Sequence, residues 1–155
     1  GTAGGAEKCA LAMANGYDHV IDYTSKDFEA EVMRLTDGQG VDVAYDSVGN
    51  DTMARTITST KRHGTIIAFG QSSGPYVDFK ITDLAKGSYY LSRPTLFHFA
   101  ADRAWLETAS AKLFEVVSDG TVTVSINQRF PLEDVARAHE ALTSRSTTGC
   151  TILMP

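Results

Sequence analysis

The chain has 155 residues, of which 43% are hydrophobic and 21% charged, and its net charge at neutral pH is -5. This composition is typical of a globular domain with a buried core, and the acidic balance without a basic cluster argues against a nucleic-acid-binding surface. No apolar run approaches the ~18 residues that a membrane span needs, and we expect no signal peptide. Cys9 and Cys150 lie outside any CxxC motif. We therefore expect no metal site, no disulfide framework, and a cytoplasmic location.

Helices and strands are predicted to alternate along the chain. Gly1–Gly5 is predicted to be a loop that follows a strand lying before the chain. Apolar residues at helical spacing predict helices at 6–15, 27–35, 51–61, 79–86, 102–118 and 132–142. Runs of β-branched residues between turn residues predict strands at 19–23, 41–49, 65–69, 88–92, 121–126 and 150–154. Asn50 or Asp51 is expected to cap the third helix, and Asp102 the fifth.

The stretch VDVAYDSVG at 41–49 is the strongest predicted strand. Its near-continuous apolar run indicates a strand that is covered on both faces, as in a parallel sheet. With the helix and strand that follow it, it forms a βαβ unit. The sequence thus predicts an α/β fold with a doubly wound, mostly parallel sheet that has helices on both faces.

Ligands of such sheets bind beyond the carboxyl ends of the strands, so the residues just after each strand are candidates for a cofactor site. Small residues there let a cofactor approach the backbone. The candidates are Ser47, Val48 and Gly49 after one strand, Phe69, Gly70, Gln71 and Ser72 after the next, and Arg93 after a third. Plain turns are the alternative for the two Gly-containing segments. Arg93 could either stabilise a negative charge or pair with an acidic neighbour.

Other residues of the chain carry no recognisable catalytic pattern. Asp46 is interpreted as structural, with its carboxylate holding loop N–H groups rather than acting as a base. The four histidines show no metal-ligand spacing, and no nucleophile elbow surrounds Ser47 or Ser72. We therefore assign no catalytic acid, base or nucleophile and no metal ligand.

Several segments together resemble the second half of quinone oxidoreductases, the zinc-independent branch of the medium-chain dehydrogenases/reductases that includes zeta-crystallin. These segments are GTAGGAEK, HVIDY, YDSVGNDT, GTIIAFGQSSG, YYLSRPTL, FPLEDVARAHEAL and SRSTTGCTILMP. The resemblance implies that the family's N-terminal catalytic domain and Gly-rich nucleotide loop lie outside this chain. It implies that the doubly wound sheet is an incomplete Rossmann-like one, with a partial NADP-binding Rossmann domain at 1–120. It also implies a strand-helix-strand segment at 121–155 that packs back on the catalytic domain.

The resemblance also implies roles for individual residues toward NADPH. Lys8 would contact the 2′-phosphate, which fits the preference of NADP sites for a cation, and Tyr23 would lie near the adenine ribose. The loop at 69–72 would follow the nicotinamide half. Arg145 would lie near a phosphate, with Gly149 where the C-terminal segment returns to the cofactor. A solvated lysine, an ordinary strand-end tyrosine and a surface-loop arginine are the alternatives.

The implied activity is hydride transfer from NADPH to a quinone or a related enone. An enoyl reductase of the same superfamily, or an inert, crystallin-like fragment, remains an alternative. The resemblance further implies a homodimer formed by edge pairing of the strand at 88–92. Without the family's first two strands, a gap is expected between strands 19–23 and 41–49. The first of these strands could slide into the gap, or another chain could fill it by strand exchange.

Overall fold

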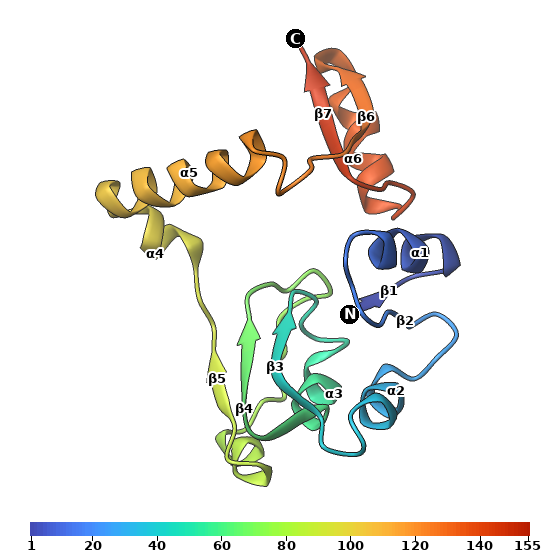
Figure 1. The fold of residues 1–155 in the computed structure, drawn as a ribbon, viewed down its shortest axis with the longest axis vertical. Coiled ribbons are helices and arrows are strands. Elements are labelled where there is room, and N and C mark those ends of the chain that lie inside the picture. Colours follow the sequence, from blue (N-terminus) through green and yellow to red (C-terminus); the bar gives the residue numbers. More distant parts are fainter. The chain divides into compact units, whose positions relative to one another are not determined.

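The structure, a computed structural model, describes residues 1–155, which form two compact units, Gly1–Leu96 and Phe97–Pro155. All the paired strands in both units run parallel, and helices connect them (Figure 1). The α/β class with parallel sheets that the sequence predicts is therefore confirmed. The predicted functional boundary at residue 120 does not coincide with the limit between the compact units and stays a prediction.

The first unit contains a sheet of three strands in the order β3–β4–β5. These strands are β3 (Val41–Asp46), β4 (Thr60–Ala68) and β5 (Tyr90–Ser92). Helix α3 (Met53–Thr58) connects β3 to β4, and the short 3-10 helix η1 (Ile81–Lys86) precedes β5. The βαβ unit that the sequence predicts is thus present, with a shorter helix and an earlier start of β4.

The core of this unit lies between α3 and the sheet. Ile66 in β4 is fully buried, and Met53, Ile57 and Ala68 pack around it. Tyr76, Phe79, Tyr89 and Leu91 complete the cluster as partly buried side chains. The segment after β4 and the residues around β5 are thus packed against the same core cluster as α3.

The structure does not bury β3 on both faces, contrary to the prediction for residues 41–49. Val43 is 45% exposed and Tyr45 is 74% exposed. Side chains alternate between the two faces of a strand, so Val43 and Tyr45 share the face opposite to that of Asp46. Helix α3 meets the Asp46 face, where Thr56 of that helix donates to the Asp46 carboxylate. The apolar run correctly predicts a strand, but a run of this kind carries no information on which face a helix covers.

The opening residues form a strand and not the predicted loop. β1 (Thr2–Ala3) pairs in parallel with β2 (Ile21–Asp22), so the predicted strand at 19–23 is only two residues long. Helix α1 (Ala6–Ala14) connects them, and α2 (Phe28–Leu35) follows. Gly-rich composition predicted a turn here, but the backbone of Thr2 and Ala3 continues extended before Gly4 and Gly5 end the strand.

β2 is not hydrogen-bonded to β3, so the sliding of this strand toward β3 that we considered does not occur. Instead, a groove of about 450 Å³ is lined by residues from the β1–β2 side, from α2 and from the start of β3. Its lining residues are Gly1, Asn15, Gly16, Tyr17, Asp18, His19, Ile21, Val32, Leu35, Thr36 and Val41. Filling of this gap by another chain stays a prediction.

The second unit contains helix α4 (Leu96–Ala100), helix α5 (Arg103–Ser118) and a pair of strands. The first residue of α4, Leu96, is also the last residue of the first unit. Asp102 caps α5 as predicted, accepting hydrogen bonds from the amides of Ala104 and Trp105 at 3.0 and 3.3 Å. The 3-10 helix η2 (Leu132–Asp134) and helix α6 (Val135–Thr143) connect β6 (Ile126–Pro131) to β7 (Cys150–Met154).

The predicted strand at 121–126 is wrong, because β6 begins where that prediction ends. β7 pairs with residues 126–131, and Phe130 lies opposite Leu153 in the ladder. The alternation in TVTVSI satisfies the strand pattern, yet these residues have no partner strand, whereas NQRF gains its hydrogen bonds from β7. Pairing therefore overrides the local pattern.

The predicted cap of α3 is also wrong. Thr52 is the capping residue, and its hydroxyl donates to the Asp46 carboxylate at 2.8 Å instead of accepting from a helix amide. The carbonyl of Gly49 accepts the amides of Thr52 and Met53. No helix of the structure has both the length and the apolar character that crossing a bilayer requires.

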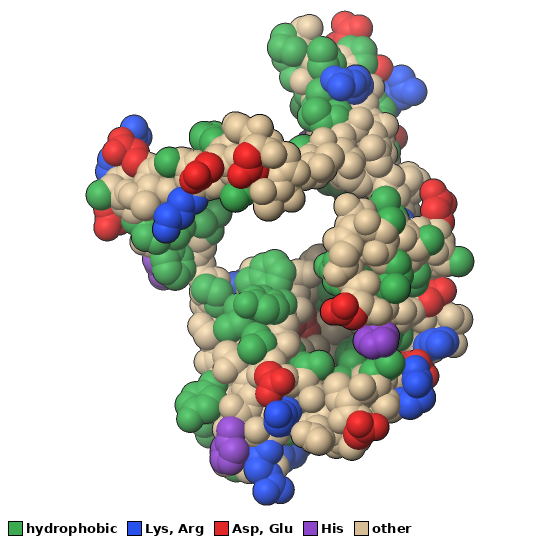
Figure 2. Space-filling view, in the orientation of Figure 1, with side chains coloured by type: hydrophobic (Ala, Val, Ile, Leu, Met, Phe, Trp, Pro, Cys, Tyr) green, Lys and Arg blue, Asp and Glu red, His purple; other side chains and the backbone are tan.

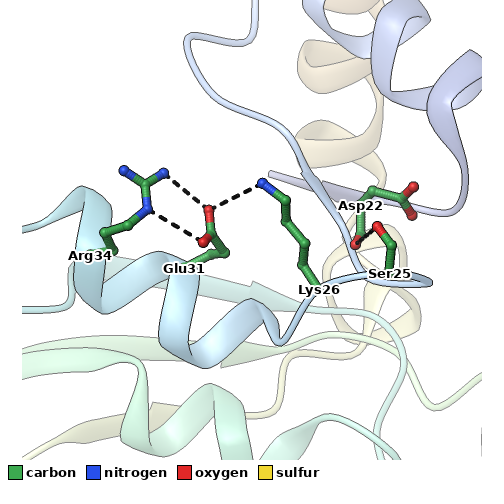
Figure 3. A network of polar contacts seen from close by, with 5 residues as sticks. All are labelled: Asp22, Ser25, Lys26, Glu31 and Arg34. Carbon is green, nitrogen blue, oxygen red and sulfur yellow. Dashed lines mark hydrogen bonds and ion pairs between the residues drawn. The ribbon is translucent and has the colours of Figure 1, made fainter.

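Helix α2 forms several ion pairs at its surface (Figure 3). Glu31 lies between the cations of Lys26 and Arg34, at 3.5 and 3.0 Å. Asp27 caps the helix by accepting the amide of Ala30, and it binds the Arg55 guanidinium of α3 at 2.7 Å. The Ala30 amide and the Arg55 guanidinium hold the pKa of the Asp27 carboxyl below its usual value. The ion pair between Asp27 and Arg55 therefore requires the ionised carboxylate, whereas the contact of the Arg55 guanidinium with the Phe28 ring, 4.1 Å from its centroid, does not.

We predict that the stabilising effect of Asp27 disappears in acid. A carboxyl whose pKa is lowered by folding stabilises the folded state above its unfolded value, about 3.9 for aspartate, and this stabilisation is lost as the pH falls through the folded value. Asp27→Asn keeps a capping oxygen but no charge. The thermal midpoint of the unsubstituted chain should therefore exceed that of the variant at neutral pH, modestly because the pair is exposed, and should converge with it in acid.

The control is Asp78→Asn, which changes an exposed aspartate that forms no ion pair. Its midpoint should follow that of the unsubstituted chain at every pH. A difference between Asp27→Asn and the unsubstituted chain that stays constant down to strongly acidic pH would contradict the assignment.

Candidate functional site

A cavity of about 290 Å³ lies at the carboxyl ends of β3, β4 and β5. Four of the predicted site residues line it, one or two from each strand end: Gly49, Gly70, Gln71 and Arg93. The rest of the lining is mainly apolar and comes from Met53, Ala68, Pro75, Tyr76, Phe79 and Leu91. Parallel pairing is the reason that the three strand ends meet, as the sequence predicts.

The segments after β3 and β4 are hydrogen-bonded to each other along their length. The carbonyl of Ser47 accepts the amide of Ser72 at 3.2 Å, and the carbonyl of Val48 accepts the amide of Ser73 at 2.9 Å. The Ser73 hydroxyl donates to the same Val48 carbonyl at 2.8 Å. Four predicted site residues, Ser47, Val48, Gly49 and Ser72, therefore belong to one interlocked pair of loops, with the Ser47 and Ser72 side chains exposed.

Glycine is required at two points of this interlock. Gly49 has φ of 90°, and a Cβ atom there would lie 2.5 Å from the carbonyl oxygen of Gly74. A Cβ at Gly70 would collide with the carbonyl oxygen of Ser47. The sequence predicts that these glycines admit a cofactor to the backbone. In the structure, the backbone of the neighbouring loop already lies against each of these glycines. Contact between the two loops is therefore sufficient to explain why both residues are glycine.

Asp46 holds the first of these loops, which confirms its structural interpretation. Its carboxylate is buried and accepts the amides of Val48 and Gly49 at 2.8 and 2.9 Å. It also accepts the hydroxyls of Thr52 and Thr56. The sequence interpretation missed both threonines. Their spacing in the sequence could have identified them. Thr52 caps α3 and Thr56 lies four residues later, so the two hydroxyls are about one helical turn apart on the same face.

Phe69 lies beside the cavity and packs against Tyr45. The two rings meet edge to face with centroids 6.5 Å apart, and both are exposed. Figure 2 shows hydrophobic side chains gathered over the carboxyl ends of β3 and β4. An exposed aromatic pair beside an apolar cavity extends the surface that a flat ring could cover.

Arg93 is the charged side chain at the edge of the cavity. Its guanidinium is exposed and donates to the carbonyl of Pro94 at 3.0 Å, and it takes part in no ion pair. Of the two roles considered for it, pairing with an acidic neighbour is therefore not observed.

Lys8 and Tyr23 belong to a second group, at the carboxyl ends of β1 and β2. The Tyr23 hydroxyl lies against Gly4, where a Cβ would approach it to 2.7 Å. Asp22 accepts the amide of Gly5 at 2.9 Å, so the end of β2 holds the loop that follows β1. The Thr24 hydroxyl, together with the Gly5 and Thr24 amides, lowers the pKa of the Asp22 carboxyl. Lys8 is half-buried in the first turns of α1.

The two remaining predicted residues, Arg145 and Gly149, belong to the second unit. Arg145 is exposed just after α6 and has φ of 59°. Gly149 has φ of 62°, and a Cβ there would lie 2.5 Å from the carbonyl oxygen of Ser125. The turn between α6 and β7 therefore needs glycine at position 149 for its own geometry.

No group of three or more His, Cys, Asp and Glu side chains lies close enough together to hold a metal ion. The chemistry that the cavity offers is instead that of an apolar surface with backbone polar groups, one amide side chain and one guanidinium at its edge. Such a surface suits a planar organic ring with polar substituents.

The chain is similar in sequence to quinone oxidoreductases. It is 39% identical over 156 residues to the quinone oxidoreductase of Pseudomonas aeruginosa, and 39% identical over 158 residues to quinone oxidoreductase 1 of Escherichia coli. Both matches cover 100% of this chain and 48% of the relative. A 2-haloacrylate reductase from Burkholderia is 35% identical, again over 100% of this chain and 47% of the relative. The chain thus spans about half the length of these curated relatives.

The chain is also similar in structure to a quinone oxidoreductase. The Escherichia coli quinone oxidoreductase complexed with NADPH matches with a TM-score of 0.95 and 38% identity, over 100% of this chain and 48% of that one. The family of zinc-binding dehydrogenases matches residues 15–153. These similarities agree with the resemblance to the C-terminal part of a quinone oxidoreductase, and the chain belongs to the zinc-binding dehydrogenase family.

Proposed function

We propose that the chain is the cofactor-binding part of an NADPH-dependent quinone oxidoreductase. The observation that carries this proposal is the cavity at the ends of β3, β4 and β5, where an apolar lining meets Gly49, Gly70 and Arg93. The two quinone oxidoreductases that are 39% identical to the chain support it. In this proposal the reaction does not require zinc, and the protein is located in the cytoplasm. NADPH supplies a hydride, and a quinone accepts the hydride and a proton to become a hydroquinone.

In this proposal the first unit of the chain holds NADPH at two places. The loops at 47–49 and 69–72 hold the nicotinamide half, with backbone groups directed to its carboxamide. Lys8 and Tyr23 hold the adenosine half, with the Lys8 ammonium on the 2′-phosphate. Arg93 favours negative charge that develops on the acceptor. The protein then contributes position and electrostatics, because hydride transfer is the chemistry of the cofactor.

A second candidate is the reduction of an activated carbon–carbon double bond, the reaction class of an enoyl reductase. The 35% identity to a 2-haloacrylate reductase favours it. The same cofactor site serves both reactions, so the acceptor distinguishes them. A third possibility is that this chain, which spans about half the length of its relatives, has a structural role and no catalysis.

We predict that Lys8→Gln weakens NADPH binding by about 10- to 100-fold, because a hydrogen bond to a charged group contributes about 1.5–3 kcal/mol. NADH lacks the 2′-phosphate, so its dissociation constant should change less than about twofold. Cofactor fluorescence with the 155-residue chain measures both constants.

The matched control is Lys61→Gln, which removes a lysine that pairs with Asp42 at the amino end of β4, at the opposite edge of the sheet. It should leave both constants unchanged. Equal losses of NADPH and NADH affinity in Lys8→Gln would refute contact with the 2′-phosphate.

We predict that the chain supports catalysis when it replaces the matching region of Escherichia coli quinone oxidoreductase 1, to which it is 39% identical. The chimera should oxidise NADPH when a quinone is added and more slowly with NADH. If it turns over 2-haloacrylate and not the quinone, the second candidate is correct. A folded chimera that binds NADPH and reduces neither acceptor would support the structural role.

We also propose that the chain forms a homodimer by pairing of the β5 edges. β5 is an edge strand, and Tyr90 within it is 65% exposed. We predict that the unsubstituted chain has the mass of a dimer by light scattering and that Tyr90→Lys converts it to a monomer, because a charge on an edge strand opposes pairing. Val77→Lys, at a position that is 76% exposed outside the strands, is the control. A monomeric unsubstituted chain would contradict this proposal.

A further inference from the structure

We infer that Asp46 is the positioning residue for the nicotinamide half of the cofactor, because it fixes the loops after β3 and β4 in one arrangement. This inference rests on the proposed function, and it assigns to Asp46 a role in binding through the loops and not by contact. Two groups of Asp46 hold the loops: its side-chain carboxylate and its backbone carbonyl.

The carboxylate of Asp46 controls the loop after β3. The side chain is 4% exposed. One oxygen accepts the amides of Val48 and Gly49 at 2.8 and 2.9 Å, and these donors fold the chain back over the end of the strand. The second oxygen accepts the hydroxyls of Thr52 and Thr56 at 2.8 and 2.7 Å. The loop is thereby tied to α3, which is itself packed in the core.

The backbone carbonyl of Asp46 controls the loop after β4. It accepts the amides of Phe69 and Gly70 at 2.9 and 3.3 Å, where β4 ends. One residue therefore sets the start of both loops. The bonds from Ser72 and Ser73 to the carbonyls of Ser47 and Val48 then couple the rest of the second loop to the first.

The cavity depends on this arrangement, because it is lined by Gly49 from one loop and by Gly70 and Gln71 from the other. A shift of the loop after β3 changes the distance between the two walls. Since Gly49 and Gly70 are in contact with opposing backbone, the second loop cannot keep its position while the first one moves. We therefore expect loss of the Asp46 carboxylate to displace the loops on both sides of the cavity.

The donors around Asp46 explain why an acceptor with two oxygens is needed. Two amides and two hydroxyls point at it. Asp46→Ala therefore removes the acceptor of the Val48 and Gly49 amides and of the Thr56 hydroxyl, and leaves the Thr52 hydroxyl only the Gly49 carbonyl at 3.4 Å. Asp46→Asn keeps one oxygen for the two amides, and its NH₂ group can donate to the threonine hydroxyls, which also accept. A positioning role therefore predicts rescue by asparagine, whereas a role of the negative charge predicts none.

The test compares two ligands of the 155-residue chain, NADPH and 2′,5′-ADP, which contains only the adenosine end. We expect Asp46→Ala to weaken NADPH binding by about tenfold or more, since small misplacements of positioning groups have effects of this size or larger. Binding of 2′,5′-ADP should stay within about twofold, and Asp46→Asn should restore most of the NADPH affinity. Asp42→Ala, on the same strand but with an exposed side chain, should change neither.

Amide hydrogen exchange of the unliganded chain gives a second measurement. In Asp46→Ala, exchange should accelerate not only at Val48 and Gly49, which lose their acceptor, but also at Ser72 and Ser73, which do not contact the carboxylate. If Asp46→Ala does not fold, the double variant Thr52→Val, Thr56→Val tests the same anchoring, because it releases the carboxylate from α3 and keeps the backbone bonds. It should weaken NADPH binding and leave 2′,5′-ADP unaffected.

The outcomes separate this inference from the proposed function. If the unsubstituted chain binds no NADPH, the proposed function is wrong and the role of Asp46 falls with it. If the unsubstituted chain binds NADPH and the folded Asp46→Ala variant binds it equally well, only the role of Asp46 is overturned. Equal loss of NADPH and 2′,5′-ADP, or an asparagine variant as weak as the alanine variant, would also overturn it.

Discussion

Parallel pairing of β3, β4 and β5 is the constraint on which the site depends. Parallel strands need a crossover between them, and here α3 and the segment through η1 provide these crossovers. Each strand therefore ends at the same edge of the sheet. Residues far apart in the sequence, such as Gly49 and Arg93, consequently line one cavity. Ile66 and its neighbours in the core hold the strands in this relation.

The site that results is built mainly from backbone. Glycines at 49 and 70 let two loops touch, and the amides and carbonyls of those loops bond to each other and to Asp46. Most of its polar groups are therefore amides and carbonyls whose directions the fold sets. Side chains contribute an apolar floor, one amide at Gln71 and one guanidinium at Arg93.

The fold class and the meeting of the strand-end residues in one cavity could be predicted from the sequence, since both depend on apolar runs and on the residues that end them. The stretch at 41–49 is a strand, and the predicted residues at 49, 70, 71 and 93 share one cavity. Pairing could not be predicted, because it depends on what lies beside a strand. For this reason residues 121–126 were wrongly predicted as a strand, and Thr2 and Ala3 were wrongly predicted as a loop. The exposure of Tyr45 was missed because an apolar run does not show which face of β3 a helix covers.

The starts of two helices are held by contacts of very different sequence separation, and the entropic cost of forming these contacts differs accordingly. Helix α2 has its cap, Asp27, next to it in the sequence, so its first turn can close as soon as that segment exists. At the start of α1, the Gly5 amide is bound by Asp22, 17 residues further along. That bond can form only after β2 has reached β1. The loop before the helix that carries Lys8 therefore depends on a non-local contact, whose loop-closure entropy is larger than that of the local cap of α2.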